Sequence, residues 1–236
     1  MHAYHHASLD HGSIVRTYLP QPESSADPGW DDGSLDRALR CIGAIVSYPR
    51  RTAVVHESDA ADRLYKVMSG AVCTYKILSD GRRQIGGFYL PGDIFGLESN
   101  HGHVLAAETI TNAKVLVIKK AALAALGNRS AAMTRELLEL TARELARAQD
   151  RVLLLSSKSA QERIVGFLFE MSKRASSTGN TVELPMSRQD IADYLGLTIE
   201  TVSRTLWALE NCGAIEICAR RRISLRDRSA LTSLQV

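Results

Sequence analysis

The stretch from Ser187 to Ala214 decides the fold of the second half of this chain, and it reads SRQDIADYLGLTIETVSRTLWALENCGA. Ser187 and Asp190 have the spacing of a capping box, which predicts that a helix begins here. Gly196 can adopt the left-handed conformation that ends such a helix, and Thr198 can cap the next one. Two short helices joined by a tight turn form a helix-turn-helix.

The second of these helices has one face suited to packing and one suited to reading DNA. On a helical wheel of about 100° per residue, Ser203 and Arg204 lie within about 60° of Glu200. Arginine can donate two hydrogen bonds to guanine, glutamate can accept one from cytosine, and serine can bond to phosphate or a base edge. We therefore expect Glu200, Ser203 and Arg204 to contact bases. The apolar residues on the opposite side are Val202, Leu206 and Leu209.

A basic segment follows this helix, and it contains five arginines and one acid between Cys218 and Arg228. A solvated surface run would have the same composition, but its position directly after a helix-turn-helix favours contact with DNA phosphates. The segment AIEICARRRISL predicts two short strands of a wing, and Thr181 to Leu184 can form a third. The residues expected to contact the DNA backbone are Ser187, Thr198, Thr201, Arg221 and Arg222.

Length and composition fit a protein of two domains. The 236 residues are 45% apolar and 23% charged, and the net charge of +3 permits nucleic acid binding without requiring it. No apolar run is long enough to span a bilayer and the N-terminus lacks a signal-peptide pattern, so we expect a cytoplasmic protein.

The four cysteines are scattered without CxxC spacing, which predicts free thiols and no zinc or iron-sulfur cluster. Cys212, at the end of the second helix, is a possible site of regulation by oxidation.

The first half of the chain predicts an antiparallel β-roll of the cupin type. Residues 1–33 mix histidine, proline and glycine without apolar periodicity, which is typical of a flexible tail. Residues 34–125 form the predicted roll, in which short alternating strands follow one another from about Leu64 to Lys119. Asp80 and Gly81 are a strong hairpin signal. The predicted fold class is therefore α+β.

A helical segment from about Ala121 to Leu155 carries a long apolar stripe, and residues 126–156 are the predicted dimerisation helix. Packing against the chain's own roll is the alternative, and both can hold for different turns. Residues 157–236 form the predicted winged helix-turn-helix domain. The residues expected at the dimer interface are Met133, Leu137, Leu140, Leu145 and Val152.

In this order the segments resemble the Crp/FNR superfamily of bacterial transcription regulators, over about residues 35–228. The matching stretches are LYKVMSGAVCTYKILSDGRRQIGGFYLPGDIFG and MSRQDIADYLGLTIETVSRTLWALENCGAIEI. The string from Ile199 to Arg204 is similar to the FNR and FixK branch. There a Glu-x-x-Ser-Arg motif reads TTGA and its inverted repeat TCAA. The resemblance implies a homodimer that reads a TTGA-N6-TCAA-like palindrome with Glu200, Ser203 and Arg204.

The resemblance also bears on the signal. An iron-sulfur sensor of the FNR type needs an N-terminal run of cysteines, and this chain has none before Cys41. A cyclic-AMP receptor grips phosphate with an Arg-Ser pair, where this chain has Val104, Leu105, Ala106 and Ala107. What remains is similar to FixK, which implies an activator that needs no cofactor, contacts RNA polymerase and controls microaerobic or anaerobic genes. A haem or another small ligand stays open.

Two further features of the sequence have alternative interpretations. His101, His103 and Glu108 have the spacing of a cupin metal site, which would indicate a metal enzyme. Because the chain has no later histidine to complete that site, we expect neither a metal nor an enzyme. Trp207 lies about 20° from Glu200 on the wheel, but packing within its own domain is an equally good explanation. Trp207 is therefore not included among the expected DNA contacts.

Overall fold

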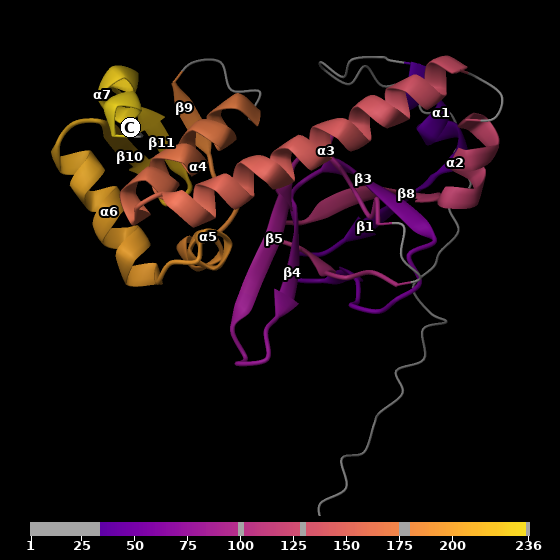
Figure 1. Ribbon diagram of the computed structural model, residues 1–236, viewed down its shortest axis with the longest axis horizontal. Coiled ribbons are helices and arrows are strands. Elements are labelled where there is room, and N and C mark those ends of the chain that lie inside the picture. Colours follow the sequence, from indigo (N-terminus) through magenta and orange to yellow (C-terminus); the bar gives the residue numbers. More distant parts are fainter. Residues whose placement is uncertain (1–33, 99–101, 128–130, 175–179, 235–236) are drawn as a thin grey trace, which may run out of the picture.

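The computed structural model describes residues 34–98, 102–127, 131–174 and 180–234. Two lobes lie side by side, and one long helix runs across both (Figure 1). The N-terminal lobe holds most of the strands, and the C-terminal lobe is largely helical. Within the described ranges, no helix is long and apolar enough to cross a membrane.

The N-terminal lobe is built on two antiparallel sheets of four strands each, which confirms the predicted roll. One sheet has the order β1-β8-β3-β6 and the other β2-β7-β4-β5. Gly81 adopts a positive φ of 83° in the turn between β4 and β5, as the Asp-Gly signal predicts. The first two strands and the helix before them, α1 (Ser34–Ile42), are additions to the elements expected from sequence. The strands are β1 (Ala44–Tyr48), β2 (Ala53–Val55), β3 (Arg63–Ser69), β4 (Val72–Ile77), β5 (Arg83–Tyr89), β6 (Ile94–Phe95), β7 (Ala106–Thr109) and β8 (Ala113–Lys119).

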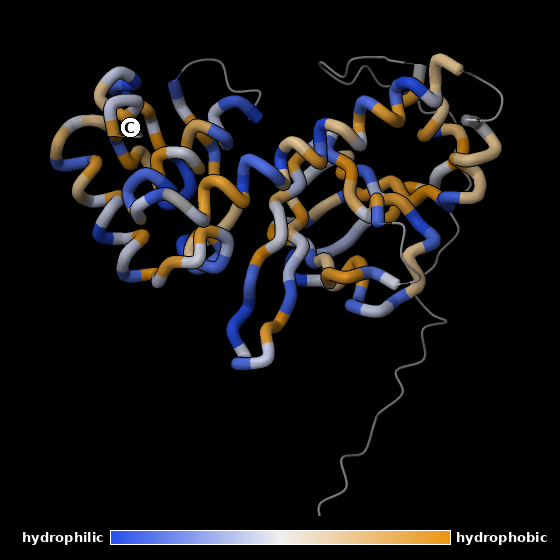
Figure 2. Tube along the Cα trace, in the orientation of Figure 1, coloured by the Kyte–Doolittle hydropathy of each residue, from blue (hydrophilic) through white to orange (hydrophobic). Residues whose placement is uncertain are grey.

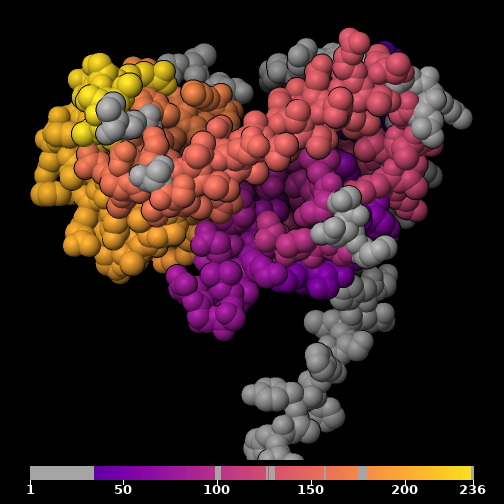
Figure 3. Space-filling model, in the orientation of Figure 1, coloured from indigo at the N-terminus to yellow at the C-terminus, as the bar shows by residue number. Residues whose placement is uncertain are grey.

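The helical segment after the roll is two helices, not the single one expected from Ala121 to Leu155. α2 (Lys120–Gly127) ends at a glycine, whose low helix propensity favours a break, and α3 (Ala131–Ser157) begins four residues later. Hydrophobic and hydrophilic residues alternate along α3 (Figure 2). The space-filling view shows α3 crossing the face of the molecule, open to solvent over much of its length (Figure 3).

The C-terminal lobe is a winged helix-turn-helix, as predicted. Its three-stranded sheet has the order β10-β11-β9, so the predicted third strand pairs with the wing. The final helix is an element that the sequence analysis did not include. The elements are α4 (Ala160–Arg174), β9 (Thr181–Glu183), α5 (Arg188–Leu195), α6 (Ile199–Asn211), β10 (Ile215–Ala219), β11 (Arg222–Leu225) and α7 (Arg228–Ser233).

One hydrophobic cluster joins the two lobes. Phe88 of β5 contacts the rings of Phe167 and Tyr194 in the C-terminal lobe, with centroids 6.2 and 5.0 Å apart. On β4, Cys73 belongs to this shared cluster, whereas Val72 belongs to the interior of the roll. Both residues are buried, so both faces of β4 are covered here. The strand therefore lacks the alternation of buried and exposed residues that a strand with one solvent-exposed face shows. We call this contact between β4–β5 and α4–α5 the junction.

Arginine side chains reinforce the junction. Arg83 of β5 forms ion pairs with Glu108 and with two carboxylates of α5, Asp190 at 2.9 Å and Asp193 at 3.5 Å. Arg174 of α4 pairs with Asp93 of the roll at 2.7 Å. These groups are mostly removed from water, where a paired charge is stable and an unpaired one is costly. The lobes are therefore held in one relative orientation by both packing and charge.

Candidate DNA-binding surface

The caps of the helix-turn-helix are formed as the sequence predicts. Ser187 Oγ accepts a hydrogen bond from the Asp190 amide at 3.1 Å, and Asp190 Oδ2 accepts one from the Ser187 amide at 2.8 Å. Gly196 ends α5 with a φ of 64°, in the left-handed region that favours glycine. Thr198 Oγ1 then accepts from the Thr201 amide at 3.2 Å and starts α6. Together these contacts fix the angle at which α6 leaves the turn.

The two faces of α6 are those expected from the helical wheel. Val202, Leu206 and Leu209 are buried in the lobe. Glu200 and Arg204 are exposed on the other side, and Ser203 is half-buried between them. We call Glu200, Ser203 and Arg204 the reading edge. It presents an acceptor, a hydroxyl and a guanidinium to solvent from one side of one helix.

Glu200 is held in its charged form at the start of α6. Hydrogen bonds from its own backbone amide and from the Thr198 hydroxyl lower the pKa of the Glu200 carboxyl, and the charge of Arg204 acts in the same direction. A carboxylate at a helix N-terminus is also favoured by the helix dipole. At neutral pH Glu200 is therefore an acceptor, as a contact with cytosine requires.

The residues expected at the DNA backbone lie around the reading edge. The hydroxyls of Thr198 and Thr201 lie 3.1 Å apart at the start of α6, and Ser187 begins α5. Arg221 lies in the turn of the wing, where its carbonyl oxygen accepts a hydrogen bond from the Leu184 amide. Arg222 is exposed at the start of β11. The structure thus brings the helix-turn-helix and the wing to one side of the lobe.

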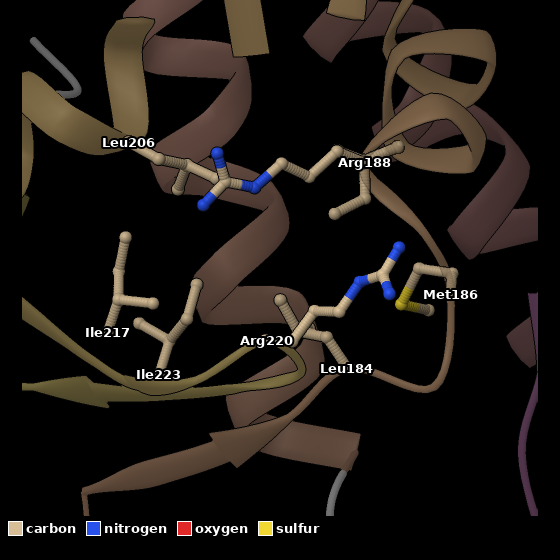
Figure 4. Close-up of a pocket in the computed structure, with 8 residues that line it drawn as sticks. Leu184, Met186, Arg188, Leu206, Ile217, Arg220 and Ile223 are labelled. Atoms are coloured by element: carbon tan, nitrogen blue, oxygen red, sulfur yellow. The ribbon is translucent and has the colours of Figure 1, made fainter. Parts of the chain in front are cut away.

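Two arginines that the sequence analysis did not include in this set converge beside it. Arg188 at the start of α5 and Arg220 in the wing reach toward the same small cavity of about 20 Å³ (Figure 4). Its lining is otherwise apolar and includes Leu206, Ile217 and Ile223. Within the described part of the chain, no carboxylate lies within 4 Å of either guanidinium. Two unneutralised positive charges on adjacent elements favour an anionic partner.

The apolar residues of α3 divide into two groups. Met133, Leu137 and Leu140 pack against the chain's own roll and α1, in the same cluster as Leu39. Leu145 and Val152, the other two predicted interface residues, are 58% and 65% exposed. Leu138, which the sequence analysis did not include, is 70% exposed, and Leu153 is exposed as well. Leu138, Leu145 and Val152 follow one another at intervals of seven residues.

The described interior of the roll contains no buried arginine. Its buried polar and charged side chains are Lys66, Thr74, His103 and Thr109, and the ammonium of Lys66 is paired with Asp36 of α1. Ala107, in the stretch where a receptor of cyclic AMP carries its Arg-Ser pair, packs into the apolar interior. The described interior of the roll therefore lacks the arginine with which a cyclic-AMP receptor grips its phosphate.

The residues of the alternative cupin metal site are not brought together among the described residues. His103 lies in the loop before β7, where it is buried, and its Nδ1 lies 3.4 Å from Glu98 Oε2. Glu108 instead pairs with Arg83 at the junction, and His101 lies outside the described residues. The described part of the chain contains no group of three side chains able to hold a metal ion.

All four cysteines are free thiols. Burial raises the pKa of the Cys73 thiol to about 12, so this group is unreactive at neutral pH. Cys212 is the C-cap of α6, and its thiol donates to the Leu209 carbonyl at 3.3 Å. Its regulation by oxidation stays a prediction.

A winged helix-turn-helix with an exposed reading edge, attached to an antiparallel roll, defines a DNA-binding transcription regulator. Residues 162–234 match the family model of the Crp-like helix-turn-helix domain, and residues 45–130 match that of the cyclic nucleotide-binding domain. The chain belongs to the Crp/FNR family of transcription regulators.

Individual relatives place it near FixK within this family. It is 41% identical to the nitrogen fixation regulation protein FixK of Azorhizobium caulinodans, over 84% of this chain and 82% of that protein. It is 40% identical to the transcriptional activatory protein AadR of Rhodopseudomonas palustris, over 70% of each chain. The solved structure of FixK2 from Bradyrhizobium japonicum matches with a TM-score of 0.78 and 45% identity, over 83% of this chain and 98% of that one.

Proposed function

We propose that two copies of this chain bind a TTGA-N6-TCAA-like palindrome without an effector and activate genes for life at low oxygen. The observation that carries this proposal is the reading edge, whose acceptor, hydroxyl and guanidinium are exposed on one side of a well-capped helix. Glu200 can accept from cytosine N4 and Arg204 can donate to guanine O6 and N7, which are the partners that a TTGA half-site and its complement provide.

A palindrome requires two reading edges related by two-fold symmetry. The two half-sites of TTGA-N6-TCAA have centres about 10 base pairs apart, or about one turn of DNA, so both edges reach the same side of the duplex. The exposed stripe of Leu138, Leu145 and Val152 supports association through α3, because apolar residues at intervals of seven pack in a parallel coiled coil. A second copy would bury these side chains, which water surrounds in a single chain.

The exposed cations support binding to the DNA backbone around the bases. Arg188 and Arg220 converge without a described carboxylate within 4 Å, and Arg221 and Arg222 lie next to them along the wing. Phosphates are the anions that such a surface would neutralise. Ser187, Thr198 and Thr201 add hydroxyls at the two helix N-termini, where the helix dipoles favour phosphate.

Effector independence is supported by the roll and by the junction. The roll interior has no buried arginine in the described residues, and the junction between the lobes is already formed in the chain alone. AadR, named as a transcriptional activatory protein, supports activation, and the anaerobic regulatory protein of Pasteurella multocida, 34% identical over 75% of this chain, supports control of low-oxygen genes. Activation would proceed through contact with RNA polymerase in the cytoplasm.

A selection of bound sequences from random DNA tests the base-reading part of this proposal. We expect an inverted TTGA repeat with a spacer of six base pairs, bound by two copies of the chain. Native mass spectrometry and the absorption spectrum of the purified protein test effector independence, and both should show polypeptide alone. Recovery of scrambled sequences would contradict the reading edge. A stoichiometric small ligand or a haem band would contradict effector independence.

Substitution on α3 tests the dimer. Leu145→Lys places a charge in the exposed stripe, and we expect the protein to sediment as a single chain and to lose high affinity for the palindrome. Arg143→Glu is the matched control, because Arg143 is also exposed but lies about 160° around the helix from Leu145. A Leu145→Lys protein that still sediments as a dimer would place the interface elsewhere.

A further inference from the structure

Trp207 is a large apolar side chain that the proposed function leaves unused. It is 64% exposed on α6, whereas its neighbours Leu206 and Leu209 are buried. It is not among the residues packed against the hydrophobic clusters, and no ring contact or hydrogen bond with another described residue accounts for it. Packing within its own lobe, the alternative interpretation of this residue, is therefore excluded by the structure.

The position of Trp207 relates it to the reading edge. On the wheel it lies about 20° from Glu200, and a rise of 1.5 Å per residue places it about 10 Å further along the helix. The major groove is about 12 Å wide. When Glu200 and Arg204 contact base edges, Trp207 therefore lies near the border of the groove, where the sugar-phosphate strand runs.

The surroundings of Trp207 are polar. The helix neighbours three and four residues away are Ser203, Arg204, Glu210 and Asn211, and all of them are polar or charged. An apolar protein partner would meet a single ring in a hydrated field of polar groups, which is a poor docking site. DNA presents deoxyribose carbons beside phosphate oxygens, and an indole can contact both at once, because its face is apolar and its Nε1–H is a donor.

We propose that Trp207 packs against the sugar-phosphate strand at the edge of the half-site, with the indole face on deoxyribose and Nε1–H donating to phosphate. This inference rests on the proposed function, because it requires the reading edge to lie in a major groove. The contact is uncharged. It adds affinity at every sequence and releases no counterion, unlike the contacts of the arginines.

Intrinsic fluorescence gives a direct test, because the chain has two tryptophans, Trp30 and Trp207. In a Trp30→Phe protein, all tryptophan emission comes from Trp207. We expect the emission to be quenched and shifted when the duplex recovered by random selection is added, while a label on the DNA reports binding independently. Unchanged emission at full occupancy of the DNA would overturn the inference and leave the proposed function standing.

Two substitutions test the nature of the contact. Trp207→Ala should weaken binding about tenfold and leave the dependence of affinity on salt unchanged, because no charge is removed. Trp207→Lys should recover affinity at low salt. It should also steepen the slope of log affinity against log salt concentration by about the amount expected for one additional phosphate contact. Unchanged affinity of Trp207→Ala would overturn the inference. A second comparison uses DNA in which one flanking thymine is replaced by deoxyuridine, which lacks the base methyl. If the parent protein and Trp207→Ala bind this DNA equally well, the ring contacts the methyl and not the backbone, and the inference is overturned.

Discussion

The arginines of the junction and the arginines of the DNA-binding surface differ in their partners. At the junction, Arg83 and Arg174 are largely buried, and each pairs with carboxylates of the other lobe. On the DNA-binding surface, Arg188, Arg204 and Arg220 have no carboxylate within 4 Å among the described residues. One side chain type therefore serves two purposes in one protein.

The difference shows that the role of an arginine depends on whether the chain itself provides a carboxylate to neutralise it. A buried guanidinium must be neutralised within the chain, since an unpaired buried charge is costly. An arginine on the surface that is left without a carboxylate keeps its positive potential for a partner that arrives later. The substitutions below separate the two groups by what each one changes, namely stability for the junction and DNA affinity for the surface.

The largest effect is expected at the junction. Arg83→Met leaves Glu108, Asp190 and Asp193 without their shared cation, and we expect the free energy of unfolding to fall by about 2–4 kcal/mol. Urea denaturation at one fixed protein concentration measures it. Arg226→Met is the matched control, because the pair of Arg226 with Glu216 is exposed and should contribute less than about 0.5 kcal/mol. Similar losses in both proteins would mean that the junction pairs are as weak as surface pairs.

At the DNA-binding surface, the largest effect is expected from Arg204→Ala. Loss of two hydrogen bonds to guanine should cost about 1–3 kcal/mol on the preferred site and relax discrimination at that base pair. Titration of the palindrome and of a variant with that pair exchanged measures both effects. Equal losses on specific and random DNA would mean that Arg204 holds phosphate and reads no base. The free energy of unfolding should stay unchanged, in contrast to Arg83→Met.

Acid should weaken the junction through Asp190. Burial opposes ionisation of Asp190, but hydrogen bonds from Ser187 and Arg83 outweigh it and lower the pKa of this carboxyl below its ordinary value of 3.8. The unfolded chain therefore binds the proton more tightly than the folded chain. Stability from Asp190 is complete above about pH 4 and is lost as the pH falls through the lowered pKa. The loss between pH 5 and pH 3 should be smaller in Asp190→Asn, and an unchanged pH profile would contradict this.

The smallest effect is expected from single arginines of the wing. Arg222→Ala should weaken binding to all sequences by less than about 1 kcal/mol at moderate salt. It should also reduce the slope of log affinity against log salt concentration by about the amount expected for one phosphate contact. Affinities on specific and random DNA at several salt concentrations measure this effect. A loss confined to the palindrome would instead make Arg222 a base contact and remove its distinction from Arg204.

Local features of this fold could be predicted from the sequence, and long-range ones could not. The capping box of Ser187 and Asp190 spans four residues, so the sequence contains the whole signal. The ion pair of Arg83 with Asp190 joins positions 107 residues apart, and no local pattern encodes it. For the same reason the alternation on β4 predicts a strand but does not reveal that its second face is covered by the other lobe.

The candidate site was predicted to the extent that it lies on one helix. The wheel of α6 identified the buried and exposed faces correctly, because both follow from helical geometry. That Arg188 and Arg220 line one cavity depends on where the wing lies relative to α5, which spacing does not give. On α3, apolar side chains alone could not distinguish Met133 and Leu137, which pack on the roll, from Leu145, which is exposed.

Asp190 belongs both to the cap that starts α5 and to the ion pairs that join the lobes. For protein engineering this means that the two halves are not interchangeable parts. A chimera that took its DNA-binding half from this chain and its roll from another regulator would have to carry an arginine at the position of Arg83, together with an aromatic residue at the position of Phe88 to meet Phe167 and Tyr194. Without them, the graft would loosen the first turn of its own helix-turn-helix.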